Sequence, residues 1–524
     1  MAINEIDAPT LKAWLSDGGE IALIDVREAG QFGEAHPFFA VPLPYSRLEL
    51  GLPALVPNPA VRLVLCDEGD GVAERAAKRA EQLGFRNLHI LAGGAPAWGK
   101  AGYTLYAGVN VPSKTFGELV EHRRHTPHIS AQELQAMREA RADMVIVDGR
   151  TFAEFNRMNI PDGISCPNGE LALRIREIAP DPKTKIVVNC AGRTRSIIGA
   201  QTLLDFGVPN PVVALENGTQ GWFLAGLKLE NGATRRYPDQ VRSLEAAGLA
   251  ARARALAEKH GVSYVAPATA HGWLSDASRT TYFLDVRTAE DVAANGLPGF
   301  THAPGGQLIQ ATDQWIGVKG ARLVLVDDEM VRAPVVAAWM RQLGHDACVL
   351  AGGIAAAGAY FWRRRGPPDL PELRTVAASE AAPAIASGAV QAIDLRAGMA
   401  FRKGHIAGAA WSIRPRIGAG PAHAKPILLV ADEPGVAALA AIDLGEAGCK
   451  DIRLLAGGFE AWRAAGLPIE ATPNVPADQD CIDFLFLTAR RHDNDPEAAR
   501  QYLTWETGLL AQLDDQERGV FRIA

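Results

Sequence analysis

The chain has 524 residues, which at about 150 residues per domain predicts three or four domains rather than a single core. Its composition, with 48% hydrophobic, 22% charged and 7% aromatic residues, is that of ordinary globular domains and excludes collagen-like, disordered and coiled-coil proteins. The net charge of −7 is spread without long single-sign blocks, so we expect neither nucleic acid nor an anionic membrane as a partner.

Neither the N-terminus nor the cysteines indicate secretion. The N-terminus (MAINEID) carries acidic residues where a signal peptide would be basic and then apolar, and every charge-free stretch is too short to span a bilayer. The six cysteines include no CxxC pair and fit neither a disulfide framework nor a zinc site. We therefore expect a cytoplasmic protein with reduced thiols and with no metal or cofactor.

One pattern of elements occurs four times along the chain. Each copy opens with an aliphatic run that ends in Asp-x-Arg, and such continuous apolar runs are typical of strands buried on both faces. The four runs are IALIDVR (21–27), MVIVDGR (144–150), YFLDVR (282–287) and QAIDLR (391–396).

A second apolar strand follows in each copy at a similar interval. Counted from the Asp of Asp-x-Arg, its last residue comes after 41, 42, 42 and 37 positions, at Cys66, Cys190, Asp327 and Ala431 respectively. Because ligands bind at the carboxyl ends of parallel strands, we expect any chemistry at these four positions.

Each copy continues with an amphipathic helix and closes with a third strand and a glycine turn. The helix ends at a glycine, as at Gly84 and Gly207. The closing segments are 90–98, 214–222, 350–360 and 454–462. Strands that alternate with helices predict an α/β fold, with a parallel sheet flanked by helices in each of four tandem units.

These units resemble the rhodanese-homology family over about residues 10–471. The family's marks are the Asp-x-Arg strand end, a Gly-His-Ile-x-Gly-Ala segment, a Cys-headed loop and a Gly-Gly-x-x-x-Trp close. The fourth copy has the second mark at Gly404, His405, Ile406, Gly408 and Ala409, and the second copy has a degenerate form at 159–164. The expected domains are 1–108, 109–230, 263–372 and 373–471, with a helical connector at 231–262 and a helical tail at 472–524.

The segments outside the repeats are predicted mainly as helices. Residues 109–130 form a polar bridge, and Asp239–Lys259 is rich in helix-forming residues. The tail contains two helical patterns, at 480–490 and 496–513. We expect the tail to pack against the units, because exposing its large aromatic residues together would be unfavourable: Phe484, Phe486, Tyr502 and Trp505.

Only the second unit has a loop suited to nucleophilic chemistry. Cys190 precedes a helix, where oriented N–H groups favour a thiolate, and two arginines follow within five residues. Gly192 lets the backbone wrap round an anion. We therefore predict that Cys190 has a lowered pKa and is the catalytic nucleophile, and that the rest of the loop binds substrate: Ala191, Gly192, Arg193, Thr194, Arg195 and Ser196.

The resemblance implies a sulfurtransferase. Cys190 would take a sulfane sulfur from a donor and pass it from a persulfide to a thiol or cyanide, or to a protein acceptor. The two arginines favour thiosulfate or a glutathione persulfide over mercaptopyruvate as donor. Two alternatives stay open: a non-catalytic sulfur-relay or protein-binding scaffold, and a cysteine phosphatase, whose Cys-x5-Arg loop is one residue longer than the Cys-x4-Arg found here.

The other three loops lack this chemistry. Cys66 is followed by acidic residues that would raise its pKa and repel an anionic donor. Asp327 and Ala431 cannot form a persulfide. We therefore expect the first, third and fourth units to be inactive.

Three further sites in the second unit carry hypotheses. Cys166 is a candidate resolving thiol for the Cys190 persulfide, and Glu170 and Arg174 are candidates for lining the donor entrance. The Asp148–Arg150 pair, like its counterparts, is predicted to be a structural ion pair below the loop.

Overall fold

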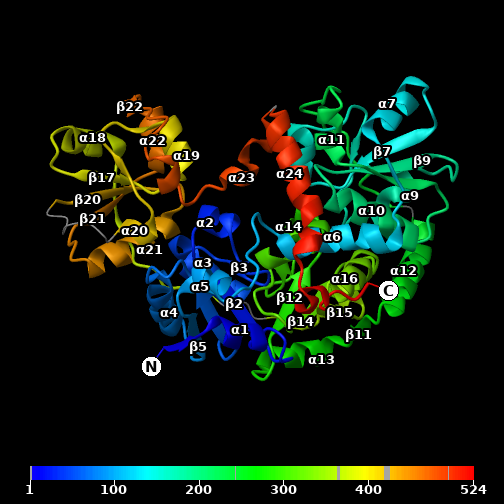
Figure 1. The fold of residues 1–524 in the computed structure, drawn as a ribbon, viewed down its shortest axis with the longest axis horizontal. Coiled ribbons are helices and arrows are strands. Elements are labelled where there is room, and N and C mark those ends of the chain that lie inside the picture. Colours follow the sequence, from blue (N-terminus) through cyan, green and yellow to red (C-terminus); the bar gives the residue numbers. More distant parts are fainter. Residues whose placement is uncertain are drawn as a thin grey trace.

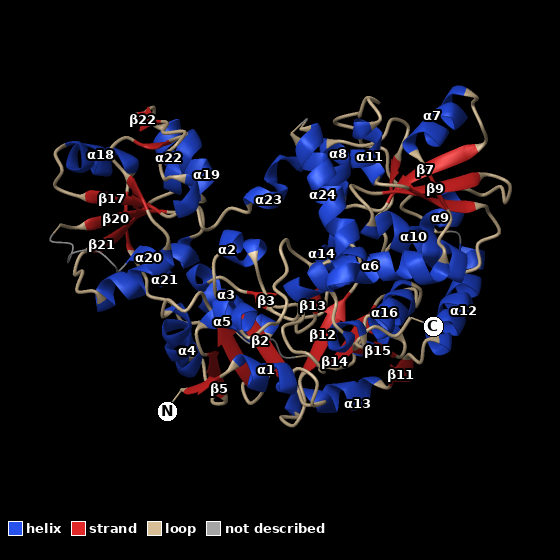
Figure 2. Cartoon of the chain, viewed as in Figure 1, coloured by secondary structure: helices blue, strands red, loops and turns tan. Residues whose placement is uncertain are grey.

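The computed structural model describes residues 3–523 apart from 242, 361, 363–365, 367, 418–424 and 494, and it consists of four α/β units and a tail (Figure 1). Each unit has a five-stranded sheet of the same order, for example β1-β5-β4-β2-β3 in the first and β6-β10-β9-β7-β8 in the second. Every strand pair within these four sheets is parallel. Helices enclose the strands of each unit (Figure 2), so the predicted fold class is confirmed.

In the first unit, both predicted long strands form in the middle of the sheet. Its strands are β1 (Asn4–Ile6), β2 (Ile21–Asp25), β3 (Val41–Pro42), β4 (Arg62–Cys66) and β5 (Leu88–Leu91). Its helices are α1 (Ala8–Trp14), α2 (Ala29–Glu34), α3 (Leu48–Leu55), α4 (Val72–Gln82) and α5 (Gly94–Lys100).

The second unit follows helix α6 (Val111–Arg124). Its strands are β6 (His128–Ile129), β7 (Met144–Asp148), β8 (Ile164–Ser165), β9 (Lys185–Asn189) and β10 (Val212–Leu215). Its helices are α7 (Ala131–Glu139), α8 (Phe152–Arg157), α9 (Leu171–Ile178), α10 (Thr194–Asp205) and α11 (Gly218–Leu224).

The third unit follows helix α12 (Ser243–Lys259), which begins four residues later than predicted. Its strands are β11 (Ser263–Val265), β12 (Thr281–Asp285), β13 (Thr301–His302), β14 (Arg322–Val326) and β15 (Asp346–Leu350). Its helices are α13 (Pro267–Gly272), α14 (Ala289–Asn295), α15 (Gly305–Gln310), α16 (Arg332–Gln342) and α17 (Gly353–Ala357).

The fourth unit adds a small antiparallel pair, β18 with β22, to its parallel sheet. Its strands are β16 (Arg374–Val376), β17 (Gln391–Asp394), β18 (His405–Ile406), β19 (Ala410–Trp411), β20 (Ile427–Val430), β21 (Ile452–Leu455) and β22 (Ile469–Glu470). Its helices are α18 (Ala378–Ala386), α19 (Gly398–Lys403), α20 (Arg414–Ile417), α21 (Pro434–Glu446) and α22 (Gly458–Ala464).

The tail runs from the fourth unit back across the molecule to the second unit and ends near the third (Figure 1). It contains α23 (Phe486–Ala489), α24 (Pro496–Gly508) and α25 (Asp515–Arg518), so the first predicted tail helix is much shorter than expected. Tyr502 is buried, as predicted, whereas Phe486 is 39% exposed. No helix among the described residues is both long and apolar enough to cross a membrane.

The predicted polar bridge at 109–130 contains helix α6, and several of its polar residues are buried. Helix α6 packs against α10 and the tail, and it buries Phe116 and Val120 together with Lys114 and Glu118. The partners of these polar residues come from distant parts of the chain. Lys114 pairs with Glu506 of the tail, for example.

Candidate functional site

The pairing of the two long strands in each unit identifies the residue that heads each loop. Asp148 lies opposite Asn189, so Cys190 is the first residue after the second strand. In the first unit Asp25 lies opposite Cys66, so the residue equivalent to Cys190 is Asp67. We call the residue at this position the loop head. The four loop heads are Asp67, Cys190, Asp327 and Ala431.

The prediction that Cys66 occupies the nucleophile position is therefore wrong. Cys66 is the last residue of β4, and its side chain is buried in the apolar cluster that contains Val64 and Leu91. Burial raises its pKa well above the ordinary value, and the nearby carboxylate of Asp25 raises it further. Among the four loop heads, only that of the second unit is a cysteine.

In each unit, the glycine turn packs against the backbone of the loop head. The Thr219 N–H donates to the Cys190 carbonyl at 2.8 Å. A Cβ added to Gly218, whose φ is +52°, would lie 2.3 Å from the same oxygen, so only glycine allows this approach. The equivalent glycines of the other units lie against their own loop heads in the same way: Gly94, Gly353 and Gly458. The closing motif thus holds the start of α11 against the Cys190 loop.

In the first and third units, the carboxylate of the loop head accepts hydrogen bonds from the backbone of its own loop. The Asp327 carboxylate accepts from the N–H groups of Val331 at 2.8 Å and Arg332 at 2.7 Å. The Asp67 carboxylate accepts from Gly69 at 2.8 Å and Ala73 at 3.0 Å. Backbone amides that could bind an anion are therefore already occupied by the chain itself.

The Asp-x-Arg pairs brace the sheets behind the loops, as predicted. Arg150 and Asp148 form a buried ion pair at 2.8 Å, and each of the other three units repeats it. Asp148 also accepts from the Asn189 amide at 2.9 Å. The pair therefore orients the strand residue that directly precedes Cys190.

Cys190 itself is only 1% exposed. Burial raises the pKa of its thiol, and the carboxylate of Glu506 adds to the rise, whereas Arg195 and hydrogen bonding by Ser196 act to lower it. The prediction of a lowered pKa is therefore wrong for this closed arrangement, because the loss of hydration outweighs the positive charge of the loop.

Both loop arginines are paired with carboxylates. Arg195 makes two contacts with Glu154, at 2.8 and 2.7 Å, which hold the pKa of that carboxyl at about 2. Arg193 contacts Glu118 at 2.7 Å and also pairs with Glu121 of the same helix, α6. Burial raises the pKa of Glu118 to about 7 despite this contact. An anionic substrate would have to compete with these carboxylates for the two guanidinium groups.

The tail helix α24 lies over the loop. The Glu506 side chain is 1% exposed, and its Oε1 accepts from the Thr194 hydroxyl at 2.9 Å and from the Lys114 ammonium at 3.2 Å. Its Oε2 is buried without a hydrogen-bond partner and lies against Gly192, where an added Cβ would be 2.8 Å away. The Tyr502 ring would lie 3.2 Å from the same added Cβ. The tail thus covers the loop that contains Cys190.

The remaining predicted loop residues lie together at the start of α10. The Ser196 hydroxyl donates to the Arg193 carbonyl at 2.8 Å, and the Ala191 carbonyl accepts from the Gln220 N–H at 3.0 Å. These bonds fix the turn in which Cys190 and Gly192 lie.

The other predicted residues of the second unit lie in different surroundings. Cys166 is fully buried in the apolar cluster around Val147 and Val188, and burial raises its pKa well above the ordinary value. Glu170 does not line an entrance as expected, because its buried carboxylate bonds to Arg332 of the third unit at 3.0 Å.

The spacing of an acidic residue and a loop arginine indicates an ion pair that we did not predict. Glu154 lies six residues after Asp148, and Asp291 lies six residues after Asp285; each pairs with the arginine five residues after its loop head, Arg195 or Arg332. The first and fourth units have Gln31 and Ala400 at the acidic position, and Val72 and Val436 where the arginines lie. The acidic residue and the loop arginine therefore occur together or not at all.

Removing the charge of Glu506 is expected to make Cys190 more reactive at lower pH. Because the carboxylate raises the pKa of the thiol, Glu506→Gln should move the midpoint of the pH–rate profile for alkylation downward. The rate is measured with iodoacetamide by mass spectrometry of the Cys190 peptide. Glu497→Gln, on the exposed side of the same helix, is the matched control and should leave the midpoint in place. An unchanged midpoint in both variants would contradict the role given to Glu506.

Comparisons with known proteins place this architecture in a family. The family model for the rhodanese-like domain matches residues 7–101, 130–225, 267–359 and 377–465. A crystal structure of a thiosulfate sulfurtransferase from Pseudomonas aeruginosa is 42% identical, covers 99% of both chains and superposes with a TM-score of 0.91.

A curated relative shares only part of the chain. An HTH-type transcriptional regulator of Mycobacterium tuberculosis is 32% identical over 111 residues, which are 21% of this chain and 48% of that protein. The chain thus spans about half the length of this curated relative. The four matched segments cover well over half of the chain, each with its own sheet. The chain therefore belongs to the rhodanese family, with four tandem rhodanese-like domains.

Proposed function

We propose that the protein is a cytoplasmic sulfurtransferase that moves a sulfane sulfur from thiosulfate or a related persulfide donor to a thiol or cyanide through a persulfide on Cys190. The observation that carries the proposal is the loop head of the second unit, where a cysteine directly follows β9 and precedes α10 in place of the Asp or Ala of the other units. The likeness to the thiosulfate sulfurtransferase of Pseudomonas aeruginosa supports it.

The proposed reaction has two half-reactions. The Cys190 thiolate attacks the outer sulfur of thiosulfate; a new S–S bond forms, the S–S bond of thiosulfate breaks, and sulfite leaves with its electron pair. The acceptor then attacks the outer sulfur of the persulfide, which gives thiocyanate from cyanide and restores the thiolate. The first N–H groups of α10 would stabilise the anionic sulfur in both steps.

Entry of a donor requires the loop to open, because Cys190 is 1% exposed. We propose that α24 moves away, so that Arg193 and Arg195 can exchange their carboxylate partners for the oxygens of an anionic donor. Ala191, Gly192, Thr194 and Ser196 would then line the site. The role of Cys166 as a resolving thiol stays a prediction, and its burial gives that role no support.

Mass spectrometry of the thiosulfate-treated protein tests the proposal. The peptide that contains Cys190 is expected to gain the mass of one sulfur atom, and a reducing thiol should remove it. The peptides of Cys66 and Cys481, two other buried cysteines, serve as internal controls and should stay unmodified. Sulfur on those peptides alone, or on none, would overturn the proposal.

A second candidate function is a sulfur-relay or protein-binding scaffold without turnover. It is favoured by the three loop heads that lack a thiol, Asp67, Asp327 and Ala431. A relay would accept one sulfur from thiosulfate but would not release further sulfite when cyanide is added, whereas an enzyme would. A phosphatase is a weaker candidate, since the loop is one residue short, and it would be recognised by hydrolysis of p-nitrophenyl phosphate.

A further inference from the structure

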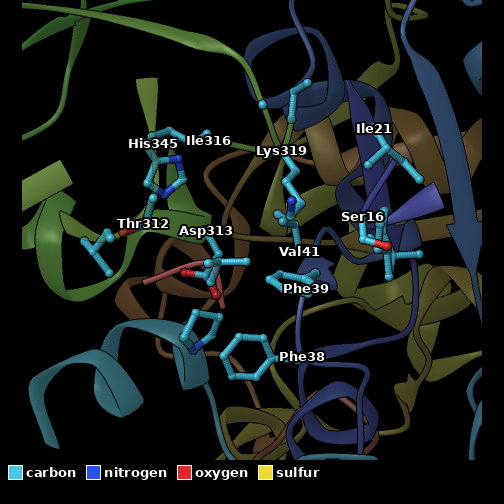
Figure 3. A pocket seen from close by; sticks show the side chains of 18 of the residues that line it. Ser16, Ile21, Phe38, Phe39, Val41, Thr312, Asp313, Ile316, Lys319 and His345 are labelled. Atoms are coloured by element: carbon cyan, nitrogen blue, oxygen red, sulfur yellow. The ribbon is translucent and has the colours of Figure 1, made fainter. Parts of the chain in front are cut away.

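A cavity of about 510 Å³ lies where the first unit, the start of α6, the third unit and the end of the tail meet, and Cys190 is not among the residues that line it (Figure 3). The first unit contributes β2 and the segment 38–41, the third unit contributes 312–320 and 343–345, and the tail contributes 515–522. None of the predicted site residues lines it. The proposed function therefore does not account for this space.

Much of the wall is apolar. Phe38 and Phe39 meet edge to face with ring centroids 5.0 Å apart, and Ile21, Val41 and Ile316 line the cavity with them (Figure 3). Such a surface can hold a hydrophobic group of a ligand.

A cation lines the same space. The Lys319 ammonium lies 5.4 Å from the centre of the Phe39 ring, and no carboxylate of the described residues is within ion-pair distance of it. Asp17 attracts the Lys319 ammonium only over a longer range. Burial lowers the pKa of Lys319. Burial also lowers the pKa of His345 to about 4, so this neighbouring imidazole is neutral at pH 7. The ammonium therefore lacks the anionic partner that a half-buried charge normally has.

Unused acceptors lie on other parts of the wall. The Asp313 Oδ1 and the Gln516 Oε1 are both buried without a hydrogen-bond partner, although buried polar atoms are normally bonded. Asp313 does not form an ion pair with Lys319, although both line the cavity. Within the described part of the chain, the cavity thus presents a cation without a carboxylate partner and two oxygens, Asp313 Oδ1 and Gln516 Oε1, without a hydrogen-bond partner.

We propose that this cavity binds a small zwitterion with an apolar side group, such as an α-amino acid or a short peptide. The ligand's carboxylate would bind Lys319, its ammonium would bind Asp313 and Gln516, and its side group would pack against Phe38 and Phe39. An apolar ligand would leave all three polar groups unpaired, and a ligand with only one charge would leave one side of the cavity unpaired. The proposal is independent of sulfur transfer.

Calorimetric titration of the full chain with three matched probes tests the inference. L-phenylalanine carries both charges, 3-phenylpropionate lacks the ammonium, and phenethylamine lacks the carboxylate. L-phenylalanine is expected to bind saturably and each analogue about tenfold or more weakly, because each analogue leaves one charged group of the cavity without its hydrogen-bonded partner. No saturable binding of L-phenylalanine, or equal binding of all three probes, would overturn the proposal.

Two variants test which residue of the cavity binds each charge of the ligand. Lys319→Met should weaken L-phenylalanine about tenfold but leave phenethylamine unchanged, and Asp313→Asn should weaken L-phenylalanine but leave 3-phenylpropionate unchanged. Lys100→Met, at an exposed position outside the cavity, is the control and should bind like the unaltered protein. Binding that survives both cavity variants would contradict the site. The comparison of probes on the unaltered protein stands even if a variant fails to fold.

Discussion

Replacing Cys190 by alanine is expected to lower kcat/KM for sulfite release from thiosulfate by roughly 10³-fold or more, because the proposed sulfur acceptor is lost and no other loop head is a cysteine. The Cβ is kept, so the turn clamped by Thr219 and Gly218 should be retained. The measurement is a colorimetric assay of thiocyanate with cyanide as acceptor, together with circular dichroism to verify the fold.

Cys66→Ala is the informative control for this variant. Cys66 lies one residue before the loop head and points into the core, so its replacement should leave kcat/KM within about twofold while costing some stability through a small cavity. A Cys190→Ala protein with full activity, or a Cys66→Ala protein without any, would each contradict the assignment of the nucleophile.

The sequence predicts the four repeats well because strands buried on both faces leave a strong pattern of apolar residues. The Asp-x-Arg ends, the second strands and the glycine turns all lie where their motifs indicate. The error at Cys66 comes from a single residue. Its interval from Asp25 is 41, against 42 in the second and third units, and only the strand pairing shows that this difference moves Asp67 to the loop head.

The surroundings of Cys190 were less predictable. Glu506 bonds to Thr194 across 312 residues of sequence, and no local pattern identifies such a contact. The sequence correctly placed two arginines beside Cys190, but it did not reveal that Glu118 and Glu154 already pair with them. The charge of a loop therefore depends on partners that only the packed structure supplies. The predicted direction of the Cys190 pKa was wrong mainly because the thiol is buried, and the carboxylate of Glu506 adds to the rise.

Arg332, at the end of the third unit's loop, forms ion pairs that reach a neighbouring unit. The Arg332 side chain is 1% exposed and contacts four carboxylates. One belongs to the second unit and the others to the third: Glu170 at 3.0 Å, Asp291 at 2.7 Å, Asp328 at 2.5 Å and Glu329 at 2.7 Å. With Asp327 filling its amides, this loop has become part of the contact between two units.

Arg332→Met is therefore expected to be strongly destabilising, by about 3–5 kcal/mol, because it leaves the buried Glu170 with Arg174 as its remaining cationic partner. The melting temperature should fall by about 10 °C or more. Arg332 lowers the pKa of Asp291, so this contribution is present above the unfolded-state pKa and is lost as the pH falls; the difference from the unaltered protein should shrink under acidic conditions.

A second substitution shows whether the loss of stability comes from the buried charge of Glu170 or from the changed shape of the side chain at position 332. Adding Glu170→Gln to Arg332→Met removes the buried carboxylate that has lost one of its two arginine partners, and it should recover part of the lost stability. A double-mutant cycle of melting temperatures would measure this recovery. Arg463→Met, which breaks an exposed pair with Glu460, should change stability by less than about 1 kcal/mol. If Arg332→Met were as mild as Arg463→Met, the ion cluster would not be what holds the second and third units together, and the retained arginine of this loop would need another explanation.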